Sequence, residues 1–327
     1  MPDSGHIQLD QHGETPLNNL ATPFGAIRYL YSRSADSVAQ ETSGQDYLAF
    51  RYDEERVTFA LCDGVGQSFM GELAARFLGE RLVDWLWKYE GPSDPVAFGT
   101  AVRMFLNHLQ SEADTLVSQT PLPDDLPPLT REALEMQRDY GSEAMFVAGR
   151  ADLGPKTDRV LLCWLGDSTL RPLDAGGQAI DIGPPGTTAE RWSTKQGIKG
   201  QVHVWRGTTA QVNRLVAHSD GIDTESVMGA LGTHGLLQQA VDRLQGQPPS
   251  DDVSLLDVNL DKEPAFRPLE IPGQPKPPTV PQVPTIPIQP VKPPAPSVEG
   301  WREITVEGLT GVAVGMMIVW RLARPQE

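Results

Sequence analysis

The sequence predicts an α+β fold in which two sheets pack face to face and helices lie outside them. Two observations favour this class. Strand-like segments come first, two adjacent amphipathic helices follow, and more strands with one late helix complete the domain. Such segregation is not the strict alternation of a parallel doubly wound sheet. The second observation is that acidic motifs recur at the ends of the predicted strands, so that several carboxylates could meet at one end of such a sandwich.

Short apolar or alternating runs bounded by turn formers predict the strands. They cover residues 26–31, 46–51, 57–62, 144–148, 159–165, 169–173, 201–205, 213–217 and 253–258. Apolar residues at helical spacing predict helices over residues 69–88, 95–119 and 224–244. Asp94 is suited to cap the second helix, because Pro95 follows at its first position. Polar or proline-rich stretches over 32–45 and 120–130 predict loops.

Four regions are expected along the chain. Residues 1–24 predict a flexible N-terminus, 25–262 a folded domain, 263–298 a proline-rich linker and 299–327 an apolar C-terminal segment. In the linker, proline recurs at every third position from Pro272 to Pro296. Polyproline II has three residues per turn, so this tract would form a semi-rigid spacer of roughly 75 Å. A stiff linker and a docking site for a proline-recognising partner both remain open.

The C-terminal segment contains an uncharged apolar run at residues 309–320. The run is shorter than the roughly 17–25 residues of a spanning helix. Arg321 and Arg324 follow it, on the side that a tail anchor would have to push across the membrane. Gly311 and Gly315 form a small-xxx-small pair suited to helix contact. Membrane association through residues 308–322 and docking to a partner or to the chain itself are alternatives, and in a third hypothesis linker and segment make the chain an interaction hub.

Composition narrows the partners and the compartment. The formal net charge of −16 over 327 residues argues against nucleic acid or an anionic membrane surface as the main partner. Cys62 and Cys163 lie within apolar runs and are expected to be buried free thiols, which fits a reducing compartment. The N-terminus shows no secretion signal, so we expect a cytoplasmic domain.

The acidic motifs predict a metal site. Asp63-Gly64, Gly166-Asp167-Ser168 and Ser219-Asp220-Gly221 each follow a predicted strand, and Asp251-Asp252 precedes one. Clustered carboxylates repel one another unless cations neutralise them. An all-oxygen ligand set suits Mg²⁺ or Mn²⁺ rather than zinc.

With these motifs and Gln45-Asp46, in this order, residues 20–260 resemble the PPM, or type 2C, metal-dependent protein serine/threonine phosphatases in their bacterial form. The resemblance implies a four-layer α-β-β-α sandwich with two central antiparallel sheets. It also implies a phosphoric monoester hydrolase that removes phosphate from phosphoserine and phosphothreonine through a metal-bridging hydroxide. Its substrate would be a protein that a serine/threonine kinase has phosphorylated.

The resemblance also assigns roles to residues. Asp63 would bridge two Mn²⁺ or Mg²⁺ ions, with the Gly64 carbonyl as a further ligand. Asp220 and Asp251 would complete the coordination of the first ion, and Asp167 together with Asp220 would bind a third, looser ion. Asp46, assigned as catalytic with Asp63, would support the site through metal-bound water.

Several positions depart from the family pattern. Glu41 stands where many members carry a phosphate-gripping arginine, for which Arg33 is a candidate substitute. Val65 stands where some members carry a histidine, and Glu143 where threonine is usual. Gln45 and Gln67 replace an acidic residue and a second glycine. These departures keep an alternative open: a catalytically weak or inactive pseudophosphatase that binds phosphoproteins or partners.

Two further features have modest weight. His218 precedes Asp220 but is expected to pack in the sandwich rather than to act in catalysis. The 183–186 segment, Gly-Pro-Pro-Gly, predicts a turn, in the flap that family members place beside the active site.

Overall fold

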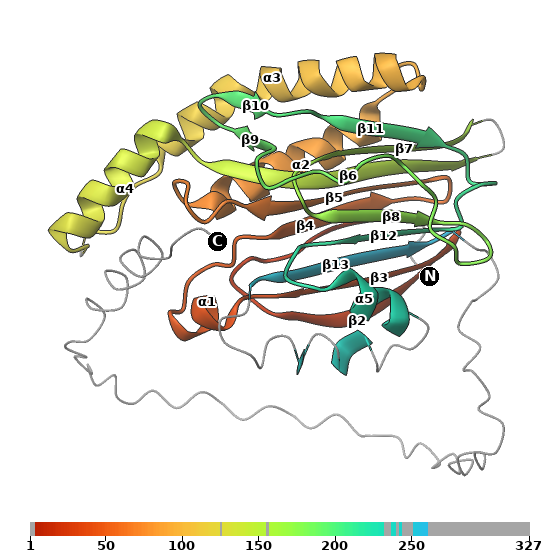
Figure 1. Ribbon diagram of the computed structural model, residues 1–327, viewed down its shortest axis with the longest axis horizontal. Helices are drawn as coiled ribbons and strands as arrows, with labels where there is room; N and C mark the ends of the chain where they lie inside the picture. Colours follow the sequence, from red (N-terminus) through yellow and green to blue (C-terminus); the bar gives the residue numbers. More distant parts are fainter. Residues whose placement is uncertain are drawn as a thin grey trace, which may run out of the picture. The chain divides into compact units, whose positions relative to one another are not determined.

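Two antiparallel sheets form the centre of the computed structural model, with helices on their outer faces (Figure 1). The structure describes residues 4–124, 126–154, 157–231, 237–239, 242–243 and 251–260. All of them belong to one unit, Met1–Ala265. The predicted proline-rich linker and the apolar C-terminal segment lie outside the described residues. Within the described part of the chain, no helix is long and apolar enough to cross a membrane.

The larger sheet has eight strands. Its central path runs β1-β4-β5-β6-β7-β11, while β9 pairs with the start of β6 and β10 pairs with β9. The strands are β1 (Gly5–Gln8), β4 (Tyr47–Tyr52), β5 (Arg56–Gly64), β6 (Glu143–Gly154), β7 (Thr157–Leu165), β9 (Arg191–Ser193), β10 (Gly197–Lys199) and β11 (His203–Gly207). The smaller sheet has the order β2-β3-β13-β12-β8. Its strands are β2 (Thr15–Thr22), β3 (Gly25–Ser32), β8 (Thr169–Leu173), β12 (Arg214–His218) and β13 (Val253–Asn259).

Helices accompany the sheets, five of them with bounds in the described part of the chain. They are α1 (Ala35–Ala39), α2 (Gly71–Lys88), α3 (Pro95–Gln119), α4 (Pro128–Tyr140) and α5 (Thr224–Ala230). In Figure 1, α2 and α3 lie over the eight-stranded sheet and α5 lies on the other side, below the five-stranded sheet. The predicted cap is present, because the Asp94 side chain accepts a hydrogen bond from the backbone N–H of Ala97.

Alternation along the strands supplies two separate apolar layers. In β5, Ala60 and Cys62 pack beneath α2 and α3, whereas Phe59 and Leu61 face the second sheet. A third layer, which includes Val216, lies between the five-stranded sheet and α5. Because successive strand residues point to opposite faces, one apolar run can serve two layers. The predicted four-layer α-β-β-α sandwich is therefore confirmed.

All nine predicted strands are present, as are the helices expected over 69–88 and 95–119. The helix expected over 224–244 begins as α5, and much of its remainder lies outside the described residues. Both cysteines are buried free thiols, as predicted.

The prediction of a flexible N-terminus over residues 1–24 was wrong for its described part. Residues 5–8 form β1, which pairs with β4, and residues 15–22 form β2, which pairs with β3. β2 is an edge strand, and Pro16 lies where its pairing with β3 is irregular, between Thr15 and Asn18, a position at which proline is tolerated. Its exposed residues are Pro16, Asn19 and Ala21, so the strand shows no clear alternation in the sequence, while Leu17 is buried against the layer under α5.

Shorter elements were also missed. The predicted loop over 32–45 contains α1, whose N-cap Ser34 accepts from the backbone N–H of Ser37. α4 begins within the predicted 120–130 loop, and the β9–β10 hairpin was not predicted. Three-residue strands are too short to show a period, so only their pairing defines them.

A buried ion network fixes the far ends of the central strands. Asp152 of β6 is 1% exposed and pairs with Arg56, Arg150 and Arg159 at 2.9, 2.9 and 2.5 Å. Arg150 also donates to the carbonyl oxygen of Tyr89, just past α2, at 2.6 Å. Burial alone would raise the pKa of Asp152, but the hydrogen bonds from Arg150 and Arg159 outweigh it and lower this pKa. The network ties β5, β6, β7 and α2 together.

We expect Asp152→Ala to lower the free energy of unfolding by about 3–5 kcal/mol, because it leaves buried arginines without their counter-charge. Urea denaturation of the purified protein measures this change. The exposed Glu54→Ala in the nearby β4–β5 turn is the control, expected to stay within about 0.5 kcal/mol of wild type. An equally mild effect of Asp152→Ala would contradict the assigned role of the network.

Candidate metal centre

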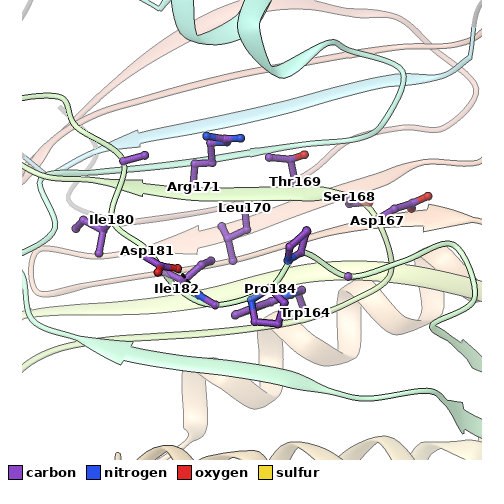
Figure 2. A pocket seen from close by; sticks show the side chains of 14 residues that line it. Trp164, Asp167, Ser168, Thr169, Leu170, Arg171, Ile180, Asp181, Ile182 and Pro184 are labelled. Carbon is purple, nitrogen blue, oxygen red and sulfur yellow. Dashed lines mark hydrogen bonds between the residues drawn. The ribbon is translucent and has the colours of Figure 1, made fainter.

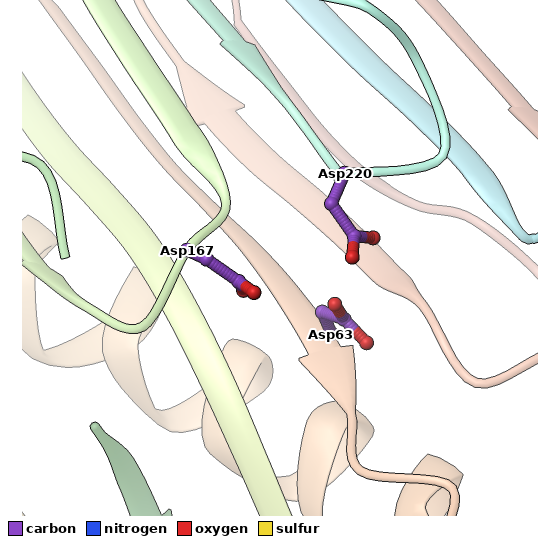
Figure 3. Close-up of side chains that lie close together, drawn as sticks. All are labelled: Asp63, Asp167 and Asp220. Atoms are coloured by element: carbon purple, nitrogen blue, oxygen red, sulfur yellow. The ribbon is translucent and has the colours of Figure 1, made fainter. Parts of the chain in front are cut away.

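Three aspartates meet where strands of both sheets end (Figure 3). Asp63 is the penultimate residue of β5, Asp167 lies in the turn between β7 and β8, and Asp220 follows β12. One carboxylate oxygen from each lies within 4.8 Å of the others. β5 and β7 belong to the larger sheet and β12 to the smaller one. The cluster therefore depends on the packing of the two sheets.

Two glycines make the approach to this cluster sterically feasible. A Cβ on Gly64 would lie 2.5 Å from the carbonyl carbon of Gly71, so only glycine lets the end of β5 touch the start of α2. Gly166 precedes Asp167 and has φ +106°, a conformation that L side chains rarely adopt. These glycines serve backbone geometry at the same points where the carboxylates converge.

The three carboxylates perturb one another. Burial raises the pKa of Asp63 well above its ordinary value, and the charge of Asp46 is the largest electrostatic addition. Burial also raises the pKa of Asp167, with a further contribution from the charge of Asp251. For Asp220, burial and then the charges of Asp251 and Asp167 raise the pKa to about 6. Such mutual destabilisation of the charged forms is what a bound cation relieves.

The donor set fits a hard divalent cation. All three groups supply oxygen, the ligand that Mg²⁺ and Mn²⁺ prefer. Within the described part of the chain, Oδ1 of Asp167 is buried without a hydrogen-bond partner. A buried carboxylate oxygen left unpaired is costly, and a cation bound in the cluster would remove that cost.

Asp251 lies next to the cluster but not within it. Its carboxylate is not among the three that come within 4.8 Å, although its charge contributes to the raised pKa of each. Its Oδ1 accepts from the backbone N–H of Asp252 at 2.8 Å. Its predicted ligand role stays a prediction, as do the roles of Asp63, Gly64, Asp167 and Asp220.

Asp252, the second acid of the doublet, has a bracing role that sequence reasoning missed. Its buried carboxylate accepts from the backbone N–H groups of Ser34, at 2.5 Å, and of Gln45. Asp252 thereby joins the start of β13 to the segments before α1 and before β4. The signal was the doublet itself: adjacent residues point to different sides, so both acids could not serve the same site.

Asp46 is buried and lies just before β4, beside the end of β5 that carries Asp63. Its Oδ2 accepts from the Ser254 hydroxyl at 2.8 Å. Burial raises the pKa of Asp46, and the charge of Asp252 raises it further. Asp46 thus acts on Asp63 through its charge, while its predicted catalytic support through water stays a prediction.

Glu143, where the family resemblance expects threonine, holds the β9–β10 hairpin. Its buried carboxylate pairs with Arg191 of β9 at 2.6 Å and with Lys199 of β10. Its carbonyl oxygen accepts from the N–H of Val65, directly after Gly64, at 2.9 Å. Glu143 therefore pairs with two positively charged side chains, Arg191 and Lys199, from a hairpin that the sequence did not reveal.

Arg33, the candidate phosphate-gripping residue, is engaged elsewhere. Its Nε pairs with Glu14 at 2.9 Å, and its guanidinium donates to the carbonyl oxygen of Thr42 at 2.9 Å. His218 is buried, and burial lowers its pKa. Its ring contacts the Ser219 carbonyl oxygen and the Thr224 hydroxyl, as expected for a packed histidine.

Comparison with known proteins identifies solved structures that share this fold. No protein-family model matches the sequence, and no curated protein matches it significantly. Among solved structures, the chain is similar to a single-substitution variant of a bacterial serine phosphatase, with 14% identity, a TM-score of 0.50, and coverage of 72% of this chain and 98% of that one. It is also similar to the serine/threonine phosphatase Stp1 from Staphylococcus aureus, with 12% identity, a TM-score of 0.51, and coverage of 71% and 94%. The chain thus has the fold of the type 2C phosphatases, and the predicted resemblance is confirmed at the level of the fold.

Without divalent cations, the aspartate cluster should make folding less favourable as pH rises. A carboxyl group whose folded-state pKa is raised stabilises the fold fully below its ordinary pKa of about 4 and loses this contribution as pH passes through the folded value. For Asp220 that loss is centred near pH 6. Asp220→Asn removes the titrating group, so the variant should melt higher than wild type at pH 7 in chelator and gain less from Mn²⁺. Thermal melts from pH 4 to 8 test this, and parallel curves for the two proteins would contradict it.

Glu143→Thr, which introduces the residue that the resemblance expects, should destabilise the protein. We expect a loss of about 1–3 kcal/mol, because Arg191 and Lys199 lose their shared partner. Chemical denaturation measures the loss. The matched control is Glu135→Thr on the exposed side of α4, which should change stability little. If Glu143→Thr were neutral as well, the carboxylate would not be what holds the hairpin.

Proposed function

We propose that this chain is a divalent-cation-dependent phosphatase acting on phosphoserine or phosphothreonine in proteins. The observation that carries the proposal is the convergence of Asp63, Asp167 and Asp220 at the shared end of two sheets. A fold alone does not define an activity. Here the type 2C phosphatase fold supports the proposal because the aspartate cluster lies at the motifs on which the family resemblance rests. Mn²⁺ and Mg²⁺ are the proposed cofactors, as two or three ions.

The residues divide the work of such a site. Asp63, Asp167 and Asp220 would hold the cations, with the Asp251 carboxylate and the Gly64 carbonyl as further proposed ligands. When bound, divalent cations supply Lewis-acid polarisation of the phosphoryl oxygens and a nucleophile from water at neutral pH. Asp252 holds the surrounding backbone in place through its amide hydrogen bonds. The Ser254 hydroxyl donates a hydrogen bond to the Asp46 carboxylate and so orients it beside Asp63.

A second candidate is a pseudophosphatase that binds phosphoproteins without turnover. The observation that favours it is that Arg33, the candidate residue for binding the substrate phosphate, already pairs with Glu14 and donates to the Thr42 carbonyl oxygen. Calorimetric titration with a phosphothreonine peptide separates the two functions. Binding that needs no Mn²⁺ and leads to no hydrolysis supports the pseudophosphatase. Turnover that depends on Mn²⁺ supports the enzyme.

We expect Asp63→Asn to lower Mn²⁺-dependent hydrolysis of a phosphothreonine peptide by at least about 100-fold, since even residues that only support metal ligands cost up to that much. Asp167→Asn should lower activity less at saturating Mn²⁺, because the Asp167 carboxylate would bind the looser ion. Asp139→Asn, on an exposed residue of α4 outside the cluster, is the charge-matched control. The full-length wild type must be folded and active in excess Mn²⁺. A folded but inactive wild type would refute the proposed function, and wild-type activity in both aspartate variants would refute the ligand assignment.

A further inference from the structure

A groove with a volume of about 400 Å³ lies beside the aspartate cluster (Figure 2). It is bounded by the end of β7, by β8 and by the 179–186 segment that precedes β9. Its apolar lining comes from Trp164, Leu170, Ile180, Ile182 and Pro184. Ligand sites in proteins are typically of this size, mostly apolar, with a few placed polar groups.

The groove is continuous with the aspartate cluster. Asp167 lines the groove and is also one of the three clustered carboxylates. The 183–186 segment packs closely against the backbone of Gly166, which directly precedes Asp167. A Cβ on Gly186 would lie 1.8 Å from the Gly166 carbonyl oxygen. A molecule whose phosphate lies at the cluster therefore has the groove next to it.

The charges in the groove lining do not favour a charged occupant. Asp167 lies at the end that the groove shares with the cluster, where cations would neutralise it, and the other two charged residues of the lining, Arg171 and Asp181, are exposed and opposite in sign. Trp164 and Leu170 add apolar surface from the core between the sheets. An uncharged, apolar side chain is the occupant that this surface matches.

We propose that the groove binds an apolar side chain of the phosphoprotein substrate, from a residue within three positions of the phosphorylated one. The inference rests on the proposed function, because it places the phosphate at the aspartate cluster. Three residues of extended chain span about 10 Å, and Asp167 belongs to both the cluster and the groove. The groove thus selects phosphorylation sites that have a leucine-like or aromatic neighbour.

A set of phosphothreonine peptides tests this selection. Each peptide carries Leu, Ala or Asp at one position from −3 to +3, and kcat/KM is measured with the full-length protein in Mn²⁺. We expect one position at which Leu exceeds Ala by roughly 10-fold or more, the discrimination that apolar pockets commonly give. Equal values for Leu and Ala at every position would overturn the proposal.

Substitution in the groove links that preference to its lining. Ile182→Asp should bring the Leu/Ala ratio at the selected position close to one. Gln178→Ala, which changes an exposed residue just before the 179–186 segment and outside the groove, should keep the wild-type ratio. If Ile182→Asp fails to fold, Ile182→Ala replaces it and should lower the ratio partially. An unchanged ratio in a folded Ile182 variant would overturn the proposal.

Hydrolysis of p-nitrophenyl phosphate by the wild type separates this inference from the proposed function. A wild type that hydrolyses this small ester but shows no peptide preference refutes the groove inference alone. A wild type that hydrolyses nothing refutes the proposed function, and calorimetric binding of the Leu and Ala phosphopeptides then decides the groove. A Leu preference in binding that Ile182→Asp abolishes would support the groove, and its absence would overturn it.

Discussion

Repulsion among carboxylates is the constraint on which the rest of this structure depends. Asp63, Asp167 and Asp220 each bring an oxygen within 4.8 Å of the others, and each has a raised pKa because burial and neighbouring charges disfavour ionisation. An isolated loop would relax by moving these side chains apart. Here they extend from strands of two packed sheets, whose apolar layers resist separation. Packing thus preserves an arrangement that electrostatics alone would disperse, and a cation makes it favourable.

Other acids of the site show how the same chemistry serves a different purpose when its partners differ. Asp252 is satisfied by backbone amides and joins three segments of the chain. Glu143 is satisfied by Arg191 and Lys199 and holds a hairpin. Both are buried near the cluster, yet each has donors of its own, so neither is left for a metal. Partner availability, rather than residue type, distinguishes the bracing acids from the candidate ligands.

The stretch between β8 and β11 provides two features beside the aspartate cluster. They are the β9–β10 hairpin, which Glu143 anchors, and the 179–186 segment, which lines the groove. In the proposed function, the clustered aspartates would hold the cations, and the groove would hold part of the substrate.

Sequence patterns predicted the central strands and the two long helices because an apolar run with a clear period has few alternatives. They also predicted that several of the four acidic motifs at strand ends could meet, and three of them, at Asp63, Asp167 and Asp220, do. Patterns failed where only pairing defines an element, as in β2, which lacks a clear alternation, and in the three-residue strands β9 and β10.

By itself, then, the sequence determined the sandwich and the aspartates at its end, because period and strand-end position are local properties. Only the tertiary structure decided that Asp252 braces the backbone while Asp251 stays beside the cluster, that Glu143 meets two cations, and that an apolar groove adjoins Asp167. Those outcomes depend on which groups from distant segments come within contact distance. No local pattern contains that information.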